Sequence, residues 1–141
     1  MSGMNNLSGK MLALAAAACL FACATGTLNI SQELSPSELI QRAQEASDRN
    51  RYNYALQYYQ ALLERNYTNI DLVCTAEYEI AFIHYKQKKY TQARTELNAL
   101  LERYNTLNSE FLPQQFKLLA YKVLERITEK EKKRSFFSGK T

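Results

Sequence analysis

Two stretches of this chain, Tyr52–Arg65 (YNYALQYYQALLER) and Tyr90–Arg103 (YTQARTELNALLER), align without gaps at an offset of 38 residues. The word ALLER recurs intact at residues 61–65 and 99–103. Both stretches place apolar or small residues three and four positions apart, the spacing of one face of an α-helix. They therefore predict two equivalent amphipathic helices.

A second helical pattern precedes each of these stretches. It comprises Leu39, Ala43 and Ala46 in the first case, and Tyr78, Ile80, Ala81, His84 and Tyr85 in the second. Each unit is therefore expected to be a helix pair. Both pairs have alanines where two helix backbones must approach closely, at Ala43 and Ala55 in the first pair and Ala81 and Ala93 in the second.

A third copy begins at Pro113 and has the pattern of a first helix without a second. Its apolar positions are Phe116, Leu119, Ala120, Val123, Leu124 and Ile127. Pro36 and Pro113 each stand where a first helical turn tolerates a missing N–H. The prediction is an all-α chain of five helices between residues 36 and 133.

These repeats resemble the tetratricopeptide repeat, a helix-turn-helix unit of about 34 residues. The match is best over residues 81–93 (AFIHYKQKKYTQA), where Lys88 replaces the usual glycine between the helices. The resemblance implies an α-solenoid of two helix pairs, at about 36–73 and 74–111, with a capping helix at 113–133. The longer period puts about four extra residues in the link around residues 67–73.

The amino-terminal residues have the layout of an export signal. An uncharged apolar run, Met11–Thr25, follows a polar start carrying Lys10, and it is shorter than the roughly 20 residues of a spanning helix. Within it, Leu20-Phe21-Ala22-Cys23 resembles the bacterial lipobox. That resemblance implies a signal peptide over residues 1–22 and a lipid anchor at Cys23. The residues that follow lack helical periodicity up to Pro36, so residues 23–35 are expected to be the anchor and a flexible tether.

Other interpretations of this region remain open. Cys23 is alternatively a chance cysteine in an ordinary signal or in an uncleaved anchor, and Cys19 is a second lipidation candidate. In each case the domain lies outside the cytoplasm. A lipidated protein of this kind faces the periplasm of a bacterial envelope, and Ala24 after the cysteine leans toward the outer membrane.

In the tetratricopeptide family the first helix of each pair lines a concave face. By helical spacing, the side chains expected there are Ile40, Gln44, Tyr78, Phe82, Tyr85, Lys86, Lys117 and Tyr121. Rigid aromatic side chains with polar neighbours suit a surface that holds a peptide. The alternative is that these rings fill the interior of a short array.

Positive charge gathers at the end of the chain, on Lys130, Lys132, Lys133, Arg134 and Lys140 against Glu131. The simple interpretation of the basic tail, residues 134–141, is a solvated helix end. The alternative is contact with anionic lipid, because Phe136 and Phe137 lie beside the cations. The exported location and near-neutral body make nucleic acid an unsuitable partner.

Composition excludes most enzyme classes. The 141 residues allow one small domain, and residues 27–138 contain no glycine for a phosphate-binding loop. One histidine and three cysteines without CxxC spacing predict no metal site. His84 is expected to be a core histidine, Cys74 a small buried apolar residue, and the protein a non-enzyme without a cofactor.

Two functions follow from these features. The first is a lipid-anchored adaptor that binds another envelope protein or peptide and scaffolds an envelope complex. The second is an accessory lipoprotein that docks a solute-binding protein and handles a small hydrophobic or anionic ligand. The sequence leaves the oligomeric state open.

Overall fold

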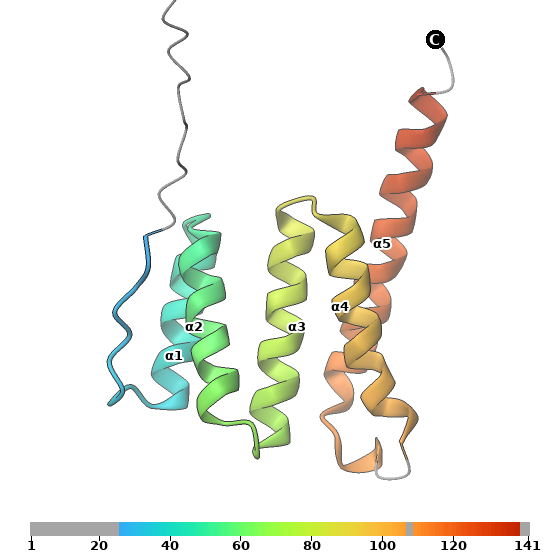
Figure 1. Ribbon diagram of the computed structural model, residues 1–141. Coiled ribbons are helices and arrows are strands. Elements are labelled where there is room, and N and C mark those ends of the chain that lie inside the picture. The colour runs from blue at the N-terminus through green and yellow to red at the C-terminus, as the bar shows by residue number, and fades with distance from the viewer. Residues whose placement is uncertain (1–25, 107–108, 139–141) are drawn as a thin grey trace, which may run out of the picture.

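The computed structural model describes residues 26–106 and 109–138. Within these residues the chain forms five α-helices and two short 3-10 helices, and no strand (Figure 1). The elements are α1 (Pro36–Asp48), α2 (Tyr52–Arg65), α3 (Ile70–Lys86), α4 (Tyr90–Glu102), η1 (Arg103–Asn105), η2 (Ser109–Phe111) and α5 (Gln114–Ser138). The predicted all-α class with five helices is confirmed.

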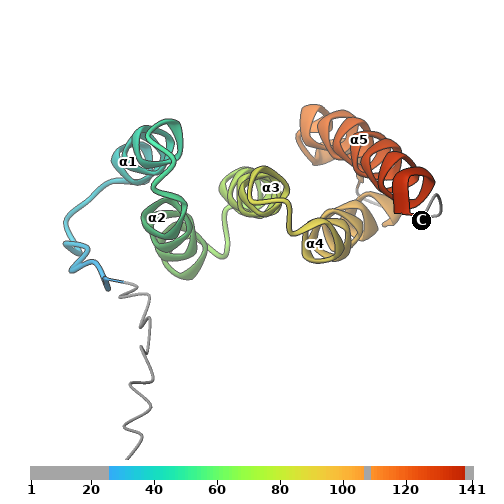
Figure 2. The same cartoon turned by 90° about the horizontal axis from the view of Figure 1, so that it is seen from above.

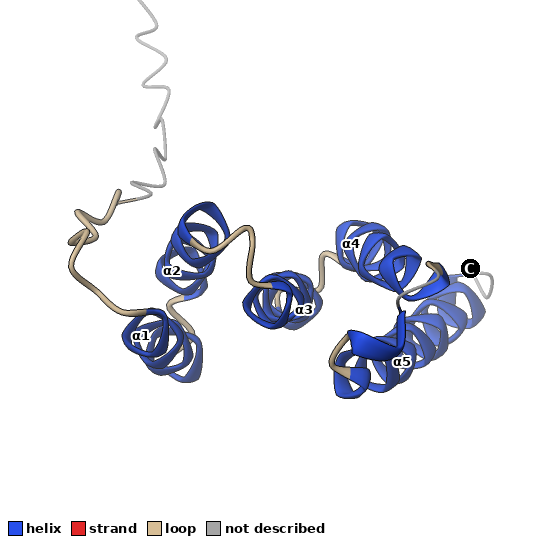
Figure 3. Cartoon of the chain, turned by 90° about the horizontal axis from the view of Figure 1, so that it is seen from below, coloured by secondary structure: helices blue, strands red, loops and turns tan. Residues whose placement is uncertain are grey.

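Consecutive helices run antiparallel and pack side by side, and α5 also contacts α3. Seen along the helix axes, α1, α3 and α5 form one layer and α2 and α4 form the other (Figures 2 and 3). Helices α1 and α2 make one hairpin and α3 and α4 make the next, so the two ALLER stretches are the second helices of neighbouring hairpins.

The turns within the two hairpins are equivalent. Asn50 (φ 56°) and Lys88 (φ 61°) both adopt the left-handed conformation, and they lie 38 residues apart. The residue after each donates its N–H to the carbonyl five positions earlier: Arg51 to Ala46 at 2.8 Å, and Lys89 to His84 at 2.9 Å. The repeat therefore extends from sequence to backbone geometry.

The core is built from the repeated positions. Ala43, Ala55, Ala81 and Ala93 are all fully buried, as expected from close helix approach. Two further pairs at the 38-residue offset are buried as well: Tyr59 with Leu97, and Leu62 with Leu100. One apolar cluster joins α1, α2 and α3, and a second joins α3, α4 and α5.

Helix α3 begins earlier than predicted. The Asn69 side chain accepts hydrogen bonds from the backbone N–H groups of Asp71 (3.1 Å) and Leu72 (3.2 Å), which caps the helix at Ile70. The predicted repeat boundary between residues 73 and 74 therefore falls inside α3. Much of the supposed extra link, residues 67–73, is instead the first turn of a longer helix.

The segment before α1 differs from the predicted flexible tether of residues 23–35. Over residues 26–35 the chain lies against α2, held by two side chains of that helix. The Gln57 side chain accepts from the N–H of Leu28 (2.7 Å) and donates to the carbonyl of Gly26 (3.0 Å). Arg65 donates to the carbonyls of Ser31 (2.9 Å) and Ile30 (3.2 Å). Ile30 and Leu34 add apolar contacts with the first core cluster. We call residues 26–35 the N-terminal strap.

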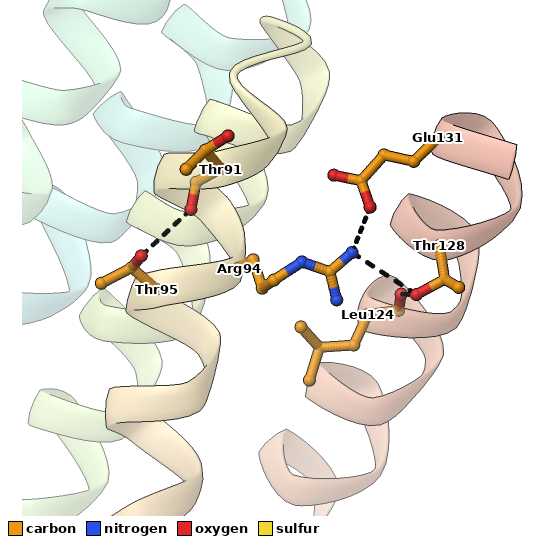
Figure 4. Close-up of polar contacts among 6 residues, drawn as sticks. All are labelled: Thr91, Arg94, Thr95, Leu124, Thr128 and Glu131. Carbon is orange, nitrogen blue, oxygen red and sulfur yellow. Dashed lines mark hydrogen bonds and ion pairs between the residues drawn. The ribbon is translucent and has the colours of Figure 1, made fainter. Parts of the chain in front are cut away.

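Helix α5 continues beyond the predicted capping helix of residues 113–133. It extends to Ser138, so residues 134–138 of the predicted tail are helical. Arg94 of α4 donates to Thr128 at 3.5 Å and pairs with Glu131, joining the second half of α5 to the hairpin (Figure 4). Residues 139–141 lie outside the described residues.

Candidate functional site

A polar hollow of about 270 Å³ lies where α1, α2 and α3 meet. We call it the notch. Its lining combines amide, hydroxyl, carboxylate and ammonium groups, from Gln44, Ser47, Asp48, Tyr59, Glu79 and Lys86. These residues come from three helices, so the notch exists only when the first hairpin packs against α3.

Lys86 connects the notch to the aromatic side chains of α3. Its Nζ donates to Ser47 Oγ at 3.0 Å and lies 5.1 Å from the ring centroid of Phe82. Phe82 and Lys86 are four residues apart and share one helix face. The ammonium group therefore bridges α1 and α3 while resting over an aromatic ring, a favourable cation–π position.

Glu79 supplies a carboxylate to the same hollow. It precedes Lys86 by seven residues, which is two helical turns, so both point from one face of α3. Burial raises the pKa of Glu79 above its ordinary value, and the charge of Lys86 opposes that shift. The notch thus holds an acidic and a basic group at partly desolvated positions.

Tyr59 lies at the floor of the notch and is 1% exposed. Its hydroxyl has no hydrogen-bond partner among the residues that the structure describes. Burial raises the pKa of Tyr59, and the charges of Glu79 and Asp48 add to the rise. The hydroxyl therefore stays protonated at neutral pH and retains an unused hydrogen-bond donor.

An aromatic row runs along α3 beside the notch. The rings of Tyr78 and Phe82 stack at 5.8 Å between centroids, Phe82 and Tyr85 stack at the same distance, and Tyr85 meets Tyr90 at 5.9 Å. Tyr78 also meets Phe116 of α5 at 5.5 Å. The row therefore joins α3 to both α4 and α5.

The row is partly interior and partly surface. Tyr78 is 6% exposed and fills the contact with α5, and burial raises its pKa to about 12. Phe82 and Tyr85 are half-buried and border the second core cluster. The filler interpretation therefore holds for Tyr78, whereas Phe82 and Tyr85 keep part of their rings at the surface.

The other predicted groove residues have separate environments. Gln44 lines the notch with Lys86, while Ile40 packs on the first core cluster. Lys117 lies 5.9 Å from the ring centroid of Tyr104, and Tyr121 is 54% exposed on α5. A groove formed by all eight residues stays a prediction.

Four residues of the notch are not among the eight predicted groove residues: Ser47, Asp48, Tyr59 and Glu79. Tyr59 occupies a repeated core position of α2, which gave no reason to consider its hydroxyl. The spacing of Glu79 and Lys86 on one helix face was a usable signal. Ser47 carried none, because its contact with Lys86 spans 39 residues.

His84 is a core histidine, as predicted. It is 6% exposed, and its Nδ1 lies 2.6 Å from Oε2 of Glu96 on α4. Oε1 of Glu96 also accepts from Gln92 at 3.1 Å. The carboxylate partner was not anticipated because it lies 12 residues away on the other helix of the hairpin.

Cys74 is fully buried, as expected for a small apolar residue, and burial raises its pKa. Among the described residues, no cluster of three or more histidine, cysteine or acidic side chains is arranged to bind a metal ion. Across that same part of the chain, no helix combines the length and apolarity needed to cross a bilayer. Cys23, the predicted lipidation site, and the signal segment 1–22 lie outside it.

Comparison with known proteins shows similarity to a bacterial protein. An uncharacterized protein of Treponema pallidum (strain Nichols) is 34% identical over 110 residues, which are 77% of this chain. The chain spans 44% of the length of that relative. No protein-family model and no solved structure matches.

Proposed function

We propose that this chain is a lipid-anchored, periplasm-facing adaptor with a tetratricopeptide-like solenoid that binds a segment of another envelope protein. The observation that carries the proposal is the equivalence of the two hairpins. Their left-handed turn residues, turn hydrogen bonds and buried positions recur at an offset of 38. Stacked equivalent hairpins are the architecture that repeat proteins use for holding partners.

The proposed anchor is Cys23 in the sequence Leu20-Phe21-Ala22-Cys23. The similarity to the Treponema pallidum protein supports a bacterial setting, where a lipobox directs lipidation of its cysteine. The location that follows is the envelope, with the outer membrane favoured over the inner by Ala24.

The proposed partner surface comprises the notch together with the surface edges of Phe82 and Tyr85. The notch supplies a hydrogen-bond donor at Lys86 and an acceptor at Glu79, which suits backbone and polar groups of an extended segment. The neighbouring half-buried rings supply apolar area. The partner expected here is a peptide with polar backbone contacts and at least one apolar side chain.

The adaptor is favoured over the ligand carrier by the packing of the aromatic row. A carrier would need Tyr78, Phe82 and Tyr121 around one cavity. Tyr78 is instead closed off by Phe82 and Phe116, and Tyr121 is exposed on α5. A surface of this kind contacts a partner more readily than it encloses a small molecule.

Site-specific photo-crosslinking in the native envelope tests the partner surface. A photoreactive amino acid at Gln44 or Phe82 should give the same covalent adduct with one envelope protein. The matched controls are Gln60 and Asn98, which are exposed on α2 and α4 and equivalent at the 38-residue offset. Equal crosslinking from the controls and from Gln44 and Phe82, or none from either Gln44 or Phe82, would rule out this surface.

Lipid labelling tests the anchor separately. The wild-type chain should incorporate a labelled fatty acid and lose the label in Cys23→Ala. Label retained by Cys23→Ala would move the site elsewhere, with Cys19 as the next candidate.

A further inference from the structure

Segments far apart in the sequence meet at one end of the molecule. The described chain begins there at Gly26, and the turns α1–α2 and α3–α4 and the last part of α5 lie at the same end (Figure 1). One surface hollow is lined jointly by Gly26, residues 50–54 and Gln87, and another by residues 88–92, Glu131 and Arg134. We call this the turn end.

The two ends of the molecule differ in charge. The turn end, taken as residues 45–54, 86–93 and 127–138, has nine cations and four anions. The opposite end, taken as residues 31–41, 62–73, 99–106 and 109–116, has two cations and six anions. The cations of the turn end are Arg49, Arg51, Lys86, Lys88, Lys89, Lys130, Lys132, Lys133 and Arg134.

Helix α5 carries this charge beyond the rest of the helices. Its last turns extend past the α3–α4 turn in Figure 1, and Arg94 fixes their direction through Thr128 and Glu131 (Figure 4). Phe136 and Phe137 at its end are 65% and 74% exposed. Lysine and arginine beside exposed aromatic rings are suited to the headgroup region of an anionic bilayer.

We infer that the turn end is a membrane-docking surface for anionic phospholipid, with α5 reaching the headgroups through its basic residues, Phe136 and Phe137. The orientation rests on the proposed anchor, because Cys23 is within about 11 Å of Gly26 by chain length and so tethers the same end. The lipid holds the chain at the bilayer, and the basic residues determine which end of the domain faces the headgroups. The helix axes then stand steeply to the membrane, and the acidic end faces away from it.

Tryptophan fluorescence on the mature, membrane-reconstituted chain tests the docking, because the sequence contains no tryptophan. Phe137→Trp probes the turn end, and Phe111→Trp, at a 75% exposed site of the opposite end, is the matched probe. Two kinds of vesicle are compared, brominated phosphatidylcholine with phosphatidylglycerol and brominated phosphatidylcholine alone. Tryptophan emission of the first variant should be at least about twofold lower in the vesicles that contain phosphatidylglycerol. Emission of the second should stay unchanged in both lipids.

A charge-matched pair of variants isolates the basic residues. In the Phe137→Trp background, Lys132→Glu with Lys133→Glu should abolish the lipid-dependent quenching. Lys122→Glu with Arg126→Glu makes the same charge change in the middle of α5 and should retain it. About 1 M salt should also remove the quenching, because it shortens the screening length to about 3 Å.

Each outcome decides for or against the docking. Equal emission from Phe137→Trp in both lipids, or equal quenching of both probes, would overturn it. A change in Phe137→Trp emission caused by soluble polyglutamate but not by vesicles would also overturn it, and would indicate an acidic protein as the partner of the turn end. The intact mass tests the anchor alone: an acylated chain with an unquenched Phe137→Trp probe refutes the docking, while a quenched probe on a chain without acyl groups refutes the anchor.

Discussion

The two hairpins share a backbone and differ in the surface that they carry. At the 38-residue offset, Ile40 corresponds to Tyr78, Gln44 to Phe82 and Asp48 to Lys86. The first hairpin therefore has an aliphatic, an amide and an acidic side chain where the second has two aromatic rings and an ammonium group. The repeated alanines and leucines specify the hairpin, and the positions that do not repeat give the two hairpins different surfaces.

The hairpins also differ in their outer cover. The first is covered by the N-terminal strap, held by polar contacts from Gln57 and Arg65 and by two apolar side chains. The second is covered by α5, which buries Phe116, Ala120, Val123 and Ile127. The second hairpin should therefore depend much more strongly on its cover.

Removing α5 is the change with the largest expected effect. A chain ending after Asn108 leaves Leu97 and Leu100 uncovered and loses the buried Phe116, Val123 and Ile127. At about 1.5–3 kcal/mol for each of these three side chains, the loss is about 5–9 kcal/mol, comparable to the whole stability of a small domain. Thermal unfolding followed by circular dichroism should lose its cooperative transition.

The control for this truncation is a chain ending after Arg134, which keeps every buried residue of α5. It should unfold within a few degrees of the full chain. If the chain ending after Asn108 still unfolds cooperatively, the second hairpin does not depend on its cover.

The His84–Glu96 pair is a smaller difference between the hairpins. The equivalent residues of the first hairpin are Ala46 and Tyr58, so His84→Ala makes the second hairpin more like the first. The variant leaves the partly buried Glu96 without its 2.6 Å partner and should lose about 1–3 kcal/mol in urea unfolding.

The control is Gln92→Ala, which removes an exposed partner of the same carboxylate. It should change the free energy of unfolding by less than about 0.5 kcal/mol. Equal losses in the two variants would mean that the buried contact with His84 has no special weight.

The sequence predicts the hairpins well because their determinants are local and repeated. The spacing of Ala43 and Ala55, and its copy at Ala81 and Ala93, reports helix contacts within a few turns of chain. The N-terminal strap could not be found in this way. Its ten residues have no periodicity, and the groups that hold it, Gln57 and Arg65, lie about 30 residues away and look like ordinary surface residues.

The notch shows the same limit for the candidate site. Helical spacing placed Gln44 of α1 and Lys86 of α3 on the same predicted concave face, and both line the notch. It could not identify Tyr59, which belongs to the first core cluster and also lines the notch. The position of Tyr59 in the notch depends on how α1, α2 and α3 pack together, so it cannot be predicted from the pattern of one helix.

Alkaline pH should affect the stability of the second hairpin more than that of the first, through Tyr78. Tyr78 has a pKa of about 12 in the folded chain against 10.0 ordinarily, whereas its counterpart Ile40 does not titrate. The folded state holds the Tyr78 proton more tightly than the unfolded state does. The contribution of Tyr78 to the free energy of unfolding is therefore complete below pH 10 and is lost as the pH rises toward 12. Between about pH 9 and pH 11, the wild type should lose about 1 kcal/mol more stability than Tyr78→Phe.

Tyr78→Phe keeps the ring contacts with Phe82 and Phe116, so at neutral pH its stability should remain close to that of the wild type. Urea unfolding at each pH gives the comparison, and the remaining tyrosines are common to both chains. Parallel losses in the two proteins would show that Tyr78 ionises equally in the folded and unfolded states.

The smallest expected effect lies in the two left-handed turns. Lys88 and Asn50 hold the same backbone conformation, but asparagine tolerates it better than lysine. Lys88→Gly removes the side-chain strain and should gain about 0.5–1 kcal/mol after the entropy cost of glycine, whereas Asn50→Gly should change stability by a few tenths. Urea midpoints of both variants measure the difference. A larger gain at Asn50 than at Lys88 would show that the backbone equivalence of the turns does not extend to their energetics.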